Sequence, residues 1–240
     1  MILSAHQPAY LPWLGLFHKI ALADTFVFMD DVKYSKSDAS NRNHIRHPAQ
    51  GRQYLTVPLR TGGSDNHNFA DLMMDDQQDW QRRHYAVISA VYGRSPHFKA
   101  YADLGDFYHT KYARLCDLTH DMLLYFLRRL GIGTVVRRAS SHALTSTKSQ
   151  YLIDLCAREA CDFYVFGALG RAYADLDAFR AAGLRTHFQD YQHPTYPQAE
   201  GPFVSHLSII DLLFNCGEAS AEILMSGNIA KATLEETPRP

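Results

Sequence analysis

Two short apolar segments near the N-terminus, separated by a proline-containing loop and a helix-length segment, constrain the fold most strongly. The first apolar run covers residues 2–5, and the second, over residues 25–29, is almost continuously apolar. Such a continuous run is typical of a strand covered on both faces, as in parallel sheets. Pro8 and Pro12 exclude a regular helix or a central strand between the two runs, and residues 14–23 have helical spacing. This order predicts a βαβ unit.

Strands and helices continue to alternate along the chain. The spacing of apolar residues predicts one helix between Asp75 and Gly93 and a longer one over 115–130. Thr147 and Gln150 have the spacing of a capping box at the start of another helix. Further strands are expected at 54–59, 134–136, 163–166 and 185–188.

Strands separated by helices favour a parallel sheet in layers. We therefore predict the fold class α/β, with a mainly parallel, Rossmann-like layered sheet, in a single domain over residues 1–240. Residues 70–132 are expected to form a helical insertion in that domain.

Composition restricts the partners. The 24 Lys and Arg residues balance 25 Asp and Glu residues, with no run of like charge, so no nucleic acid partner is expected. No apolar stretch has the ~18 residues of a spanning helix, so no membrane span is predicted. The four scattered cysteines and the absence of a signal-peptide pattern favour reduced thiols and a cytoplasmic protein.

Polar and aromatic residues follow several of the expected strands. Because the carboxyl ends of parallel strands share one edge of a sheet, these segments are expected to converge on one site. The catalytic candidates are His6 and Asp30. The candidates for substrate binding are Gln7, Tyr10, Trp13, Asn41, Arg42, Asn43, Gly167, His193, Tyr196 and Gln198.

Each candidate also has a structural interpretation. His6 suits general acid–base catalysis near neutral pH, but a strand-end histidine can equally be a structural, hydrogen-bonded one. Asp30 and Asp31 are adjacent, so at most one points into a site, and either can cap a turn. No other carboxylate stands at ligand spacing, so no metal is predicted.

Arg42 and Gly167 are the candidates for anion binding. Arg42 lies in a polar stretch and suits a bidentate grip on phosphate, although it can also be a solvated loop residue. The segment after Gly167 lacks the full phosphate-loop pattern, so a simple strand-to-helix turn is the alternative. Cys216 closes an apolar run and is expected to be an inert thiol. The chain has no GxSxG, HExxH or P-loop motif, and no cofactor is predicted.

Several blocks of the sequence resemble the WbqC-like family. The matching blocks are His6–Gln7–Pro8–Ala9–Tyr10–Leu11–Pro12–Trp13–Leu14–Gly15, Phe17–His18–Lys19–Ile20, Asp24 to Val32, Asn41 to Ile45, Leu55 to Pro58, Tyr196–Pro197–Gln198 and Leu207 to Gly217. The resemblance implies a bacterial enzyme encoded among genes for surface polysaccharides or specialised metabolites. Members are commonly described as glycosyltransferases or O-antigen biosynthesis proteins.

Together these features predict a group transferase in surface-polysaccharide or related biosynthesis. It would take a small-molecule or carrier-linked donor and a sugar or amine acceptor, with His6 as the base and Tyr10, Trp13 and Tyr196 stacking on a ring. Asp175 of the Asp175–Leu176–Asp177 sequence is expected to cap a short helix, so no metal-binding Asp-x-Asp motif is assigned, and acyl or aminoacyl transfer fits at least as well as glycosyl transfer. A non-catalytic ligand-binding protein of the same pathway is the alternative.

Overall fold

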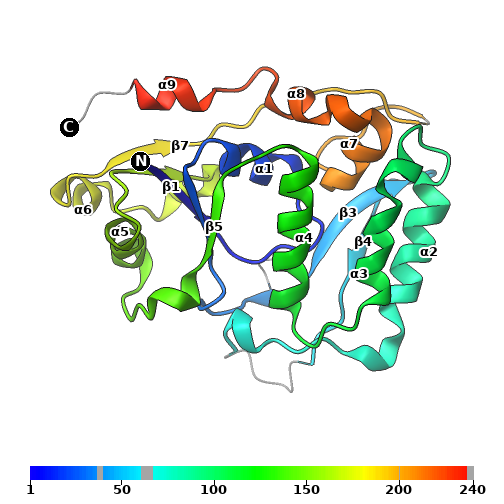
Figure 1. The fold of residues 1–240 in the computed structure, drawn as a ribbon, viewed down its shortest axis with the longest axis horizontal. Coiled ribbons are helices and arrows are strands. Elements are labelled where there is room, and N and C mark those ends of the chain that lie inside the picture. The colour runs from blue at the N-terminus through cyan, green and yellow to red at the C-terminus, as the bar shows by residue number, and fades with distance from the viewer. Residues whose placement is uncertain (37–39, 61–66, 200, 237–240) are drawn as a thin grey trace.

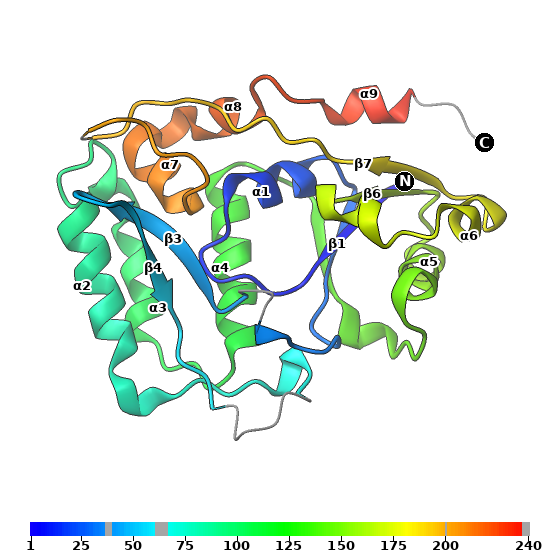
Figure 2. The same cartoon turned by 180° about the vertical axis from the view of Figure 1, so that it is seen from behind.

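The computed structural model describes residues 1–36, 40–60, 67–199 and 201–236. Its strands are β1 Ile2–His6, β2 Thr25–Phe28, β3 Arg42–His47, β4 Gly51–Thr56, β5 Val135–Arg138, β6 Phe163–Phe166 and β7 Arg185–Phe188. Its α-helices are α1 Leu14–Ala21, α2 Trp80–Tyr92, α3 Asp106–His109, α4 Leu115–Arg129, α5 Lys148–Arg158, α6 Leu176–Ala181, α7 Ile209–Cys216, α8 Ser220–Met225 and α9 Lys231–Glu235. Figures 1 and 2 show these elements from opposite sides.

Five strands form one parallel sheet in the order β5-β2-β1-β6-β7. β1 lies at the centre and pairs with β2 on one side and with β6 on the other, in both cases in parallel. β5 and β7 extend the sheet at its two edges, again in parallel. The predicted α/β fold with a parallel, Rossmann-like sheet is confirmed.

The sheet is covered on both faces, which explains the apolar runs of its strands. On one face, Leu3, Val27 and Tyr164 pack with residues of α5 and with Phe179 of α6. On the other face, Phe26 of β2 packs in a core with residues of α1 and α4. Because side chains alternate between the faces of a strand, the three inner strands β1, β2 and β6 have to be apolar at nearly every position, whereas the edge strands β5 and β7 are partly exposed and carry polar residues.

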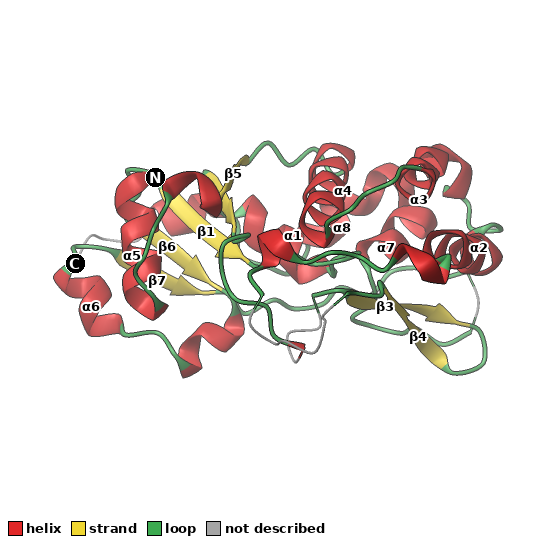
Figure 3. Cartoon of the chain, turned by 90° about the horizontal axis from the view of Figure 1, so that it is seen from below, coloured by secondary structure: helices red, strands yellow, loops and turns green. Residues whose placement is uncertain are grey.

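The chain between β2 and β5 leaves the sheet. It forms the antiparallel β3–β4 hairpin and helices α2 and α3, which lie at the other end of the long axis from the five-stranded sheet, and then α4, which lies between them and the sheet (Figure 3). One core links the two ends, since Phe17 of α1 and Ile45 of β3 belong to the same cluster as Phe126 of α4.

The hairpin corrects one expectation, because Arg42 and Asn43 lie in a strand and not in a solvated loop. The strand was missed because within β3 only Ile45 and Arg46 are buried, so its sequence has no apolar pattern. Pairing with β4, and not its own residue preferences, keeps this segment extended.

The predicted helices are present with small differences at their ends. The capping box before α5 is wrong: the Thr147 side chain makes no cap hydrogen bond, and Gln150 donates to Asp154 instead. Lys148 begins the helix with a left-handed φ of 56°, which alters the geometry of the first turn. No helix in the described ranges combines the length and apolar character needed to cross a bilayer.

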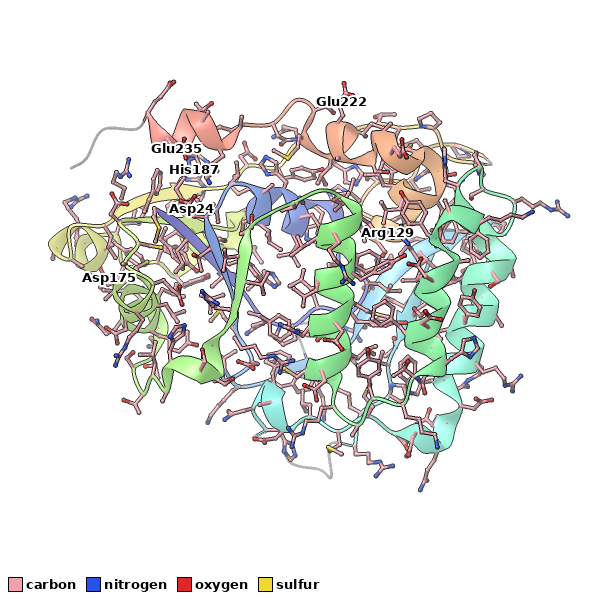
Figure 4. The ribbon with its side chains drawn as sticks, viewed as in Figure 1. Asp24, Arg129, Asp175, His187, Glu222 and Glu235 are labelled. Atoms are coloured by element: carbon pink, nitrogen blue, oxygen red, sulfur yellow. The ribbon has the colours of Figure 1, made fainter. Side chains whose placement is uncertain are left out.

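The C-terminal helix is held at the amino ends of the strands. Lys231 of α9 forms an ion pair with Asp24, the residue before β2, and Asp24 also accepts a hydrogen bond from the Ile2 backbone N–H at 2.7 Å. Figure 4 labels Asp24 near α9. α9 therefore lies away from the opposite edge of the sheet, where the carboxyl ends of the strands are.

Candidate functional site

A cavity of about 920 Å³ lies at the carboxyl ends of the parallel strands. Four strands contribute the residues at or just after their ends: Ala5, His6 and Gln7 from β1; Met29, Asp31 and Val32 from β2; Phe166, Gly167 and Ala168 from β6; Gln189, Asp190 and Tyr191 from β7. The strand ends themselves meet at this cavity, but only part of the polar segments that follow them lines it. The chain leaves β1 toward β2 on one side of the sheet and later enters β6 on the other, so the cavity lies at the topological switch point, where open α/β sheets bind ligands.

His6, the last residue of β1, presents a neutral imidazole to this cavity. Its Nδ1 lies 2.8 Å from the backbone oxygen of Gln7. Since a carbonyl can only accept, Nδ1 carries the proton and Nε2 is left as a hydrogen-bond acceptor. Burial, reinforced by the charge of Lys19, lowers the pKa of His6 to about 4. The ring is therefore uncharged at physiological pH.

Lys19 brings an amino group into the same cavity from α1. Its side chain is 4% exposed, and Nζ donates to the Ala5 backbone oxygen at 2.9 Å. No carboxylate in the described part of the chain pairs with it. Burial lowers the pKa of Lys19 to about 7. A side-chain carbon at Gly167 would lie 3.9 Å from Nζ, so this glycine keeps the space beside the amino group open.

The wall near α1 is set by close packing around Trp13. A Cβ atom at Gly15 would collide with the indole of Trp13, so only glycine fits under this ring. The indole meets Tyr191 edge-on, with ring centroids 5.6 Å apart. Gln189, just after β7, donates to the Gly15 backbone oxygen at 2.9 Å and so ties the β7 segment to α1.

The opposite wall carries a carboxylate. Asp31 follows β2, and its Oδ1 accepts a hydrogen bond of 2.5 Å from the Tyr151 hydroxyl of α5. Burial raises the pKa of Asp31, and the hydrogen bond from Tyr151 opposes that shift. Ala143 and Lys148, with φ values of 51° and 56°, bracket the loop 144–147 that completes this wall. Non-glycine residues in this conformation are strained, and such strain concentrates at functional sites.

Four of the residues predicted from the sequence line the cavity, namely His6, Gln7, Trp13 and Gly167. Asp30 does not, because its two carboxylate oxygens accept hydrogen bonds from the Ser140 backbone N–H at 2.8 Å and from the Ser140 hydroxyl at 2.9 Å. The neighbouring Asp31 takes the position in the cavity wall. The catalytic role predicted for Asp30 has no support from this arrangement.

Tyr10 points into the core and away from the cavity. Its hydroxyl lies 2.8 Å from His84 Nδ1 and 2.8 Å from the Tyr108 hydroxyl, and the side chain is fully buried. Burial lowers the pKa of His84 to about 4, so this group stays neutral too. Tyr10 thus attaches the loop after β1 to α2 and α3.

The three hairpin candidates also lie outside the cavity lining. Asn41 donates to the Val57 backbone oxygen and Asn43 to that of Leu11, both at 2.7 Å. The Arg42 guanidinium lies 5.3 Å from the centre of the Tyr54 ring. The two asparagines therefore hold backbone segments in place, and the anion-binding role of Arg42 stays a prediction.

The candidates after β7 form a separate buried network. Tyr196 and Gln198 donate to Asp211 Oδ2 at 2.9 and 2.7 Å. His193 donates from Nδ1 to the Pro194 oxygen and accepts the His206 N–H at Nε2. The His206 ring in turn stacks on Trp13 at 5.7 Å, so this segment reaches the cavity only indirectly.

The cysteines offer no nucleophile. All four are free thiols, and burial raises the pKa of each. In the part of the chain that the structure describes, no three His, Cys, Asp or Glu side chains gather as a metal site would require.

The cavity lining also contains three residues that were not predicted as site residues, namely Lys19, Asp31 and Tyr151. Lys19 had a signal in the sequence: residues 14–21 are apolar on nearly every side, and all from Leu14 to Ile20 are buried. A lysine in a helix without a polar face must be buried, and a buried lysine requires an explanation.

The comparisons with known proteins agree with the resemblance of the sequence blocks. The model of the WbqC-like protein family matches residues 7–223. An uncharacterised protein of Mycobacterium tuberculosis is 33% identical over 221 residues, which cover 91% of this chain and 95% of that protein. No solved structure gives a significant match. The matched region includes Gln7, Lys19, Asp31 and Gly167, and with that extent of agreement the chain belongs to the WbqC-like protein family.

Proposed function

We propose that the cavity is the active site of a group transferase that moves an acyl or aminoacyl group from an activated donor to an acceptor. One observation carries the proposal: a neutral imidazole with an accepting Nε2 lines the same cavity, at the switch point of the sheet, as a buried amino group that has no counter-ion among the described residues. Acyl transfer needs one group that takes a proton and one that stabilises negative charge on oxygen.

The reaction assigns one role to each group. The acceptor nitrogen or oxygen attacks the carbonyl carbon of the donor, and its proton passes to His6 Nε2 as the new bond forms. The carbonyl oxygen becomes an oxyanion, to which protonated Lys19 donates a hydrogen bond. The tetrahedral intermediate then collapses, the bond to the leaving group breaks, and the leaving group takes the proton from the imidazolium.

The titration of the two groups suits this division of work. The lowered pKa leaves His6 Nε2 unprotonated at neutral pH, and the positive charge of Lys19 favours the neutral ring. The ring is a weak base before the reaction, and the negative charge of the oxyanion beside Lys19 would favour its protonated form. With a pKa near 7, Lys19 is substantially protonated at neutral pH, and an oxyanion would favour its charged form further. The pathway, surface-polysaccharide or specialised-metabolite assembly, is proposed from the family resemblance.

The test is a transfer assay read by mass spectrometry, with acyl-coenzyme A and aminoacyl donors against amino-sugar and sugar-nucleotide acceptors. His6→Gln should slow turnover by about 10²–10⁴-fold, the usual contribution of general base catalysis. Lys19→Met should slow it by about 10²–10³-fold, as for loss of an oxyanion donor. The matched controls are His109→Gln and Lys99→Met, at exposed positions outside the cavity.

Three results would count against this function. Full turnover in both cavity variants would remove His6 and Lys19 from the reaction. Sugar-nucleotide turnover with release of the nucleotide would make the reaction glycosyl transfer. Binding of donor and acceptor with no product from any pair would favour the non-catalytic ligand-binding protein.

A further inference from the structure

The two adjacent aspartates after β2 have opposite environments. Asp30 is 1% exposed, and both of its oxygens are bonded to Ser140, with the Arg138 guanidinium 3.7 Å away. Asp31 lines the cavity, and the Tyr151 hydroxyl is its side-chain hydrogen-bond donor. One carboxylate is thus fully satisfied by the fold, whereas the other has capacity left for a ligand.

That remaining capacity faces a partly buried space. Asp31 is half-buried, and among the described residues only the Tyr151 hydroxyl and its own backbone N–H donate to its carboxylate, which can accept more hydrogen bonds than these two. Lys33 and Lys148 also line the cavity, but both are exposed and neither is within ion-pair distance of Asp31. A carboxylate oxygen accepts hydrogen bonds only, so the group that completes this site must be an N–H or O–H donor, and a cationic one is favoured.

Asp31 is close in the chain to a residue bonded to His6. The Met29 backbone N–H donates to the His6 backbone oxygen at 2.9 Å, and Asp31 follows two residues later. Two residues span at most about 7 Å. Asp31 and His6 also line the same cavity, so an acceptor bound there has both side chains in the surrounding walls.

We propose that Asp31 recognises an amino group on the acceptor, which makes the enzyme selective for amine-bearing acceptors over their hydroxyl counterparts. The inference deepens the proposed transferase function and rests on it, because the bound amine is an acceptor only if the protein is a transferase. Asp31 accepts a hydrogen bond from the amino group in its neutral and its charged form, and Tyr151 fixes the carboxylate through the other oxygen. Lys19, which enters the cavity from α1, keeps its role toward the donor carbonyl.

The test measures binding and needs no turnover. Two ligand pairs that differ only in an amino or a hydroxyl group, D-glucosamine with D-glucose and cyclohexylamine with cyclohexanol, are titrated into the intact protein and followed by NMR. The amine should bind about ten- to hundredfold more tightly than its partner, as expected for one charge-assisted hydrogen bond. Asp31→Asn should bring both members of a pair within about twofold of each other.

Two further variants sharpen the result. Asp31→Glu should keep a preference for the amine, because it keeps the carboxylate. Asp190→Asn removes another carboxylate of the cavity and should also keep the preference. Thermal unfolding of each variant checks that it is folded.

The proposal is overturned if wild-type protein binds the amines no better than the alcohols, including the case in which neither pair binds. It is equally overturned if the preference survives in Asp31→Asn. Failure of the transferase function gives a different pattern: turnover that persists in His6→Gln and Lys19→Met leaves the amine preference and its dependence on Asp31 intact.

Discussion

His6 and Lys19 are both ionisable groups that the fold has removed from water. The pKa of each is lowered because burial disfavours the charged form, and the charge of Lys19 lowers the pKa of His6 further. Such a pair costs free energy of folding and is difficult to explain as a stabilising feature. At the scale of the residue, the candidate site is therefore recognisable because two of its side chains lower the stability of the fold.

The cost of burying His6 should appear as a pH dependence of stability. Its pKa falls from 6.5 to about 4 on folding, so between pH 6.5 and 5 the unfolded chain binds a proton that the folded protein does not. The free energy of unfolding should then fall by about 1–2 kcal/mol over this interval through His6 alone.

Urea unfolding at pH 6.5 and pH 5 measures this contribution. His6→Gln should lose less stability on acidification than the wild type by that amount, whereas His109→Gln should lose as much as the wild type. Equal losses in His6→Gln and the wild type would mean that His6 titrates normally in the folded protein.

The position of a residue in the fold explains whether the sequence could identify it as a site residue. His6, Gln7 and Gly167 directly end or follow strands, and strand ends are predictable from apolar runs. Lys19 and Tyr151 reach the cavity from the sides of helices, and their direction depends on how those helices pack. Tyr10 looked like a ligand-stacking residue, but a tyrosine after a strand serves the core equally well.

At the scale of the element, the start of α5 is the most unusual feature of the fold. Lys148 has a left-handed backbone conformation at a helix start, and its neighbours in the loop 144–147 line the cavity. Residues with a side chain pay about 1–2 kcal/mol for this conformation, and glycine does not.

A glycine at this position should therefore relieve the strain. Lys148→Gly is expected to be about 1 kcal/mol more stable than Lys148→Ala in urea unfolding, because both remove the same charge and only the alanine keeps the steric cost. A glycine variant that is no more stable than the alanine variant would show that residue 148 leaves the left-handed region in solution.

The inner strands of the sheet were predictable because their apolar runs have one explanation, burial on both faces. β3 was not, since a half-exposed hairpin strand is defined by its partner and carries polar residues such as Arg42 and His44. The prediction of a capping box at the start of α5 was wrong for a related reason. The spacing of Thr147 and Gln150 is a local signal, whereas the strained turn is imposed by the packing around it.

At the scale of the whole molecule, the segment from β7 to α7 connects the sheet to the hairpin. It lines the cavity near Tyr191 and then reaches Asp211, which accepts hydrogen bonds from Tyr196, Gln198 and Tyr92 of α2. Asp211 is 1% exposed, so no water molecule can take its place as the acceptor for these donors. Because the Tyr92 hydroxyl also accepts the Arg46 backbone N–H at 3.0 Å, this network joins β3, α2 and the segment from Tyr196 to Asp211.

Asp211→Asn should consequently destabilise the entire fold. The asparagine amide would place N–H groups opposite the donors of Tyr92, Tyr196 and Gln198, so some of these hydrogen bonds would be lost. Unsatisfied donors in a buried network cost about 2–4 kcal/mol. Urea unfolding measures the loss, with the exposed Asp71→Asn as the control, which should change stability by less than about 0.5 kcal/mol. A loss in Asp211→Asn as small as in the control would mean that the network rearranges around the amide.

The position of Trp13 gives the protein an optical reporter of its own. The chain has two tryptophans, and the other, Trp80, is buried beside Tyr108, with its ring in edge contact with Tyr10. Trp13 lies in the cavity wall between Tyr191 and His206. In a Trp80→Phe background, the emission of the remaining indole would follow the exchange of water for ligand directly, so occupancy could be read in real time without a label and without knowledge of the reaction.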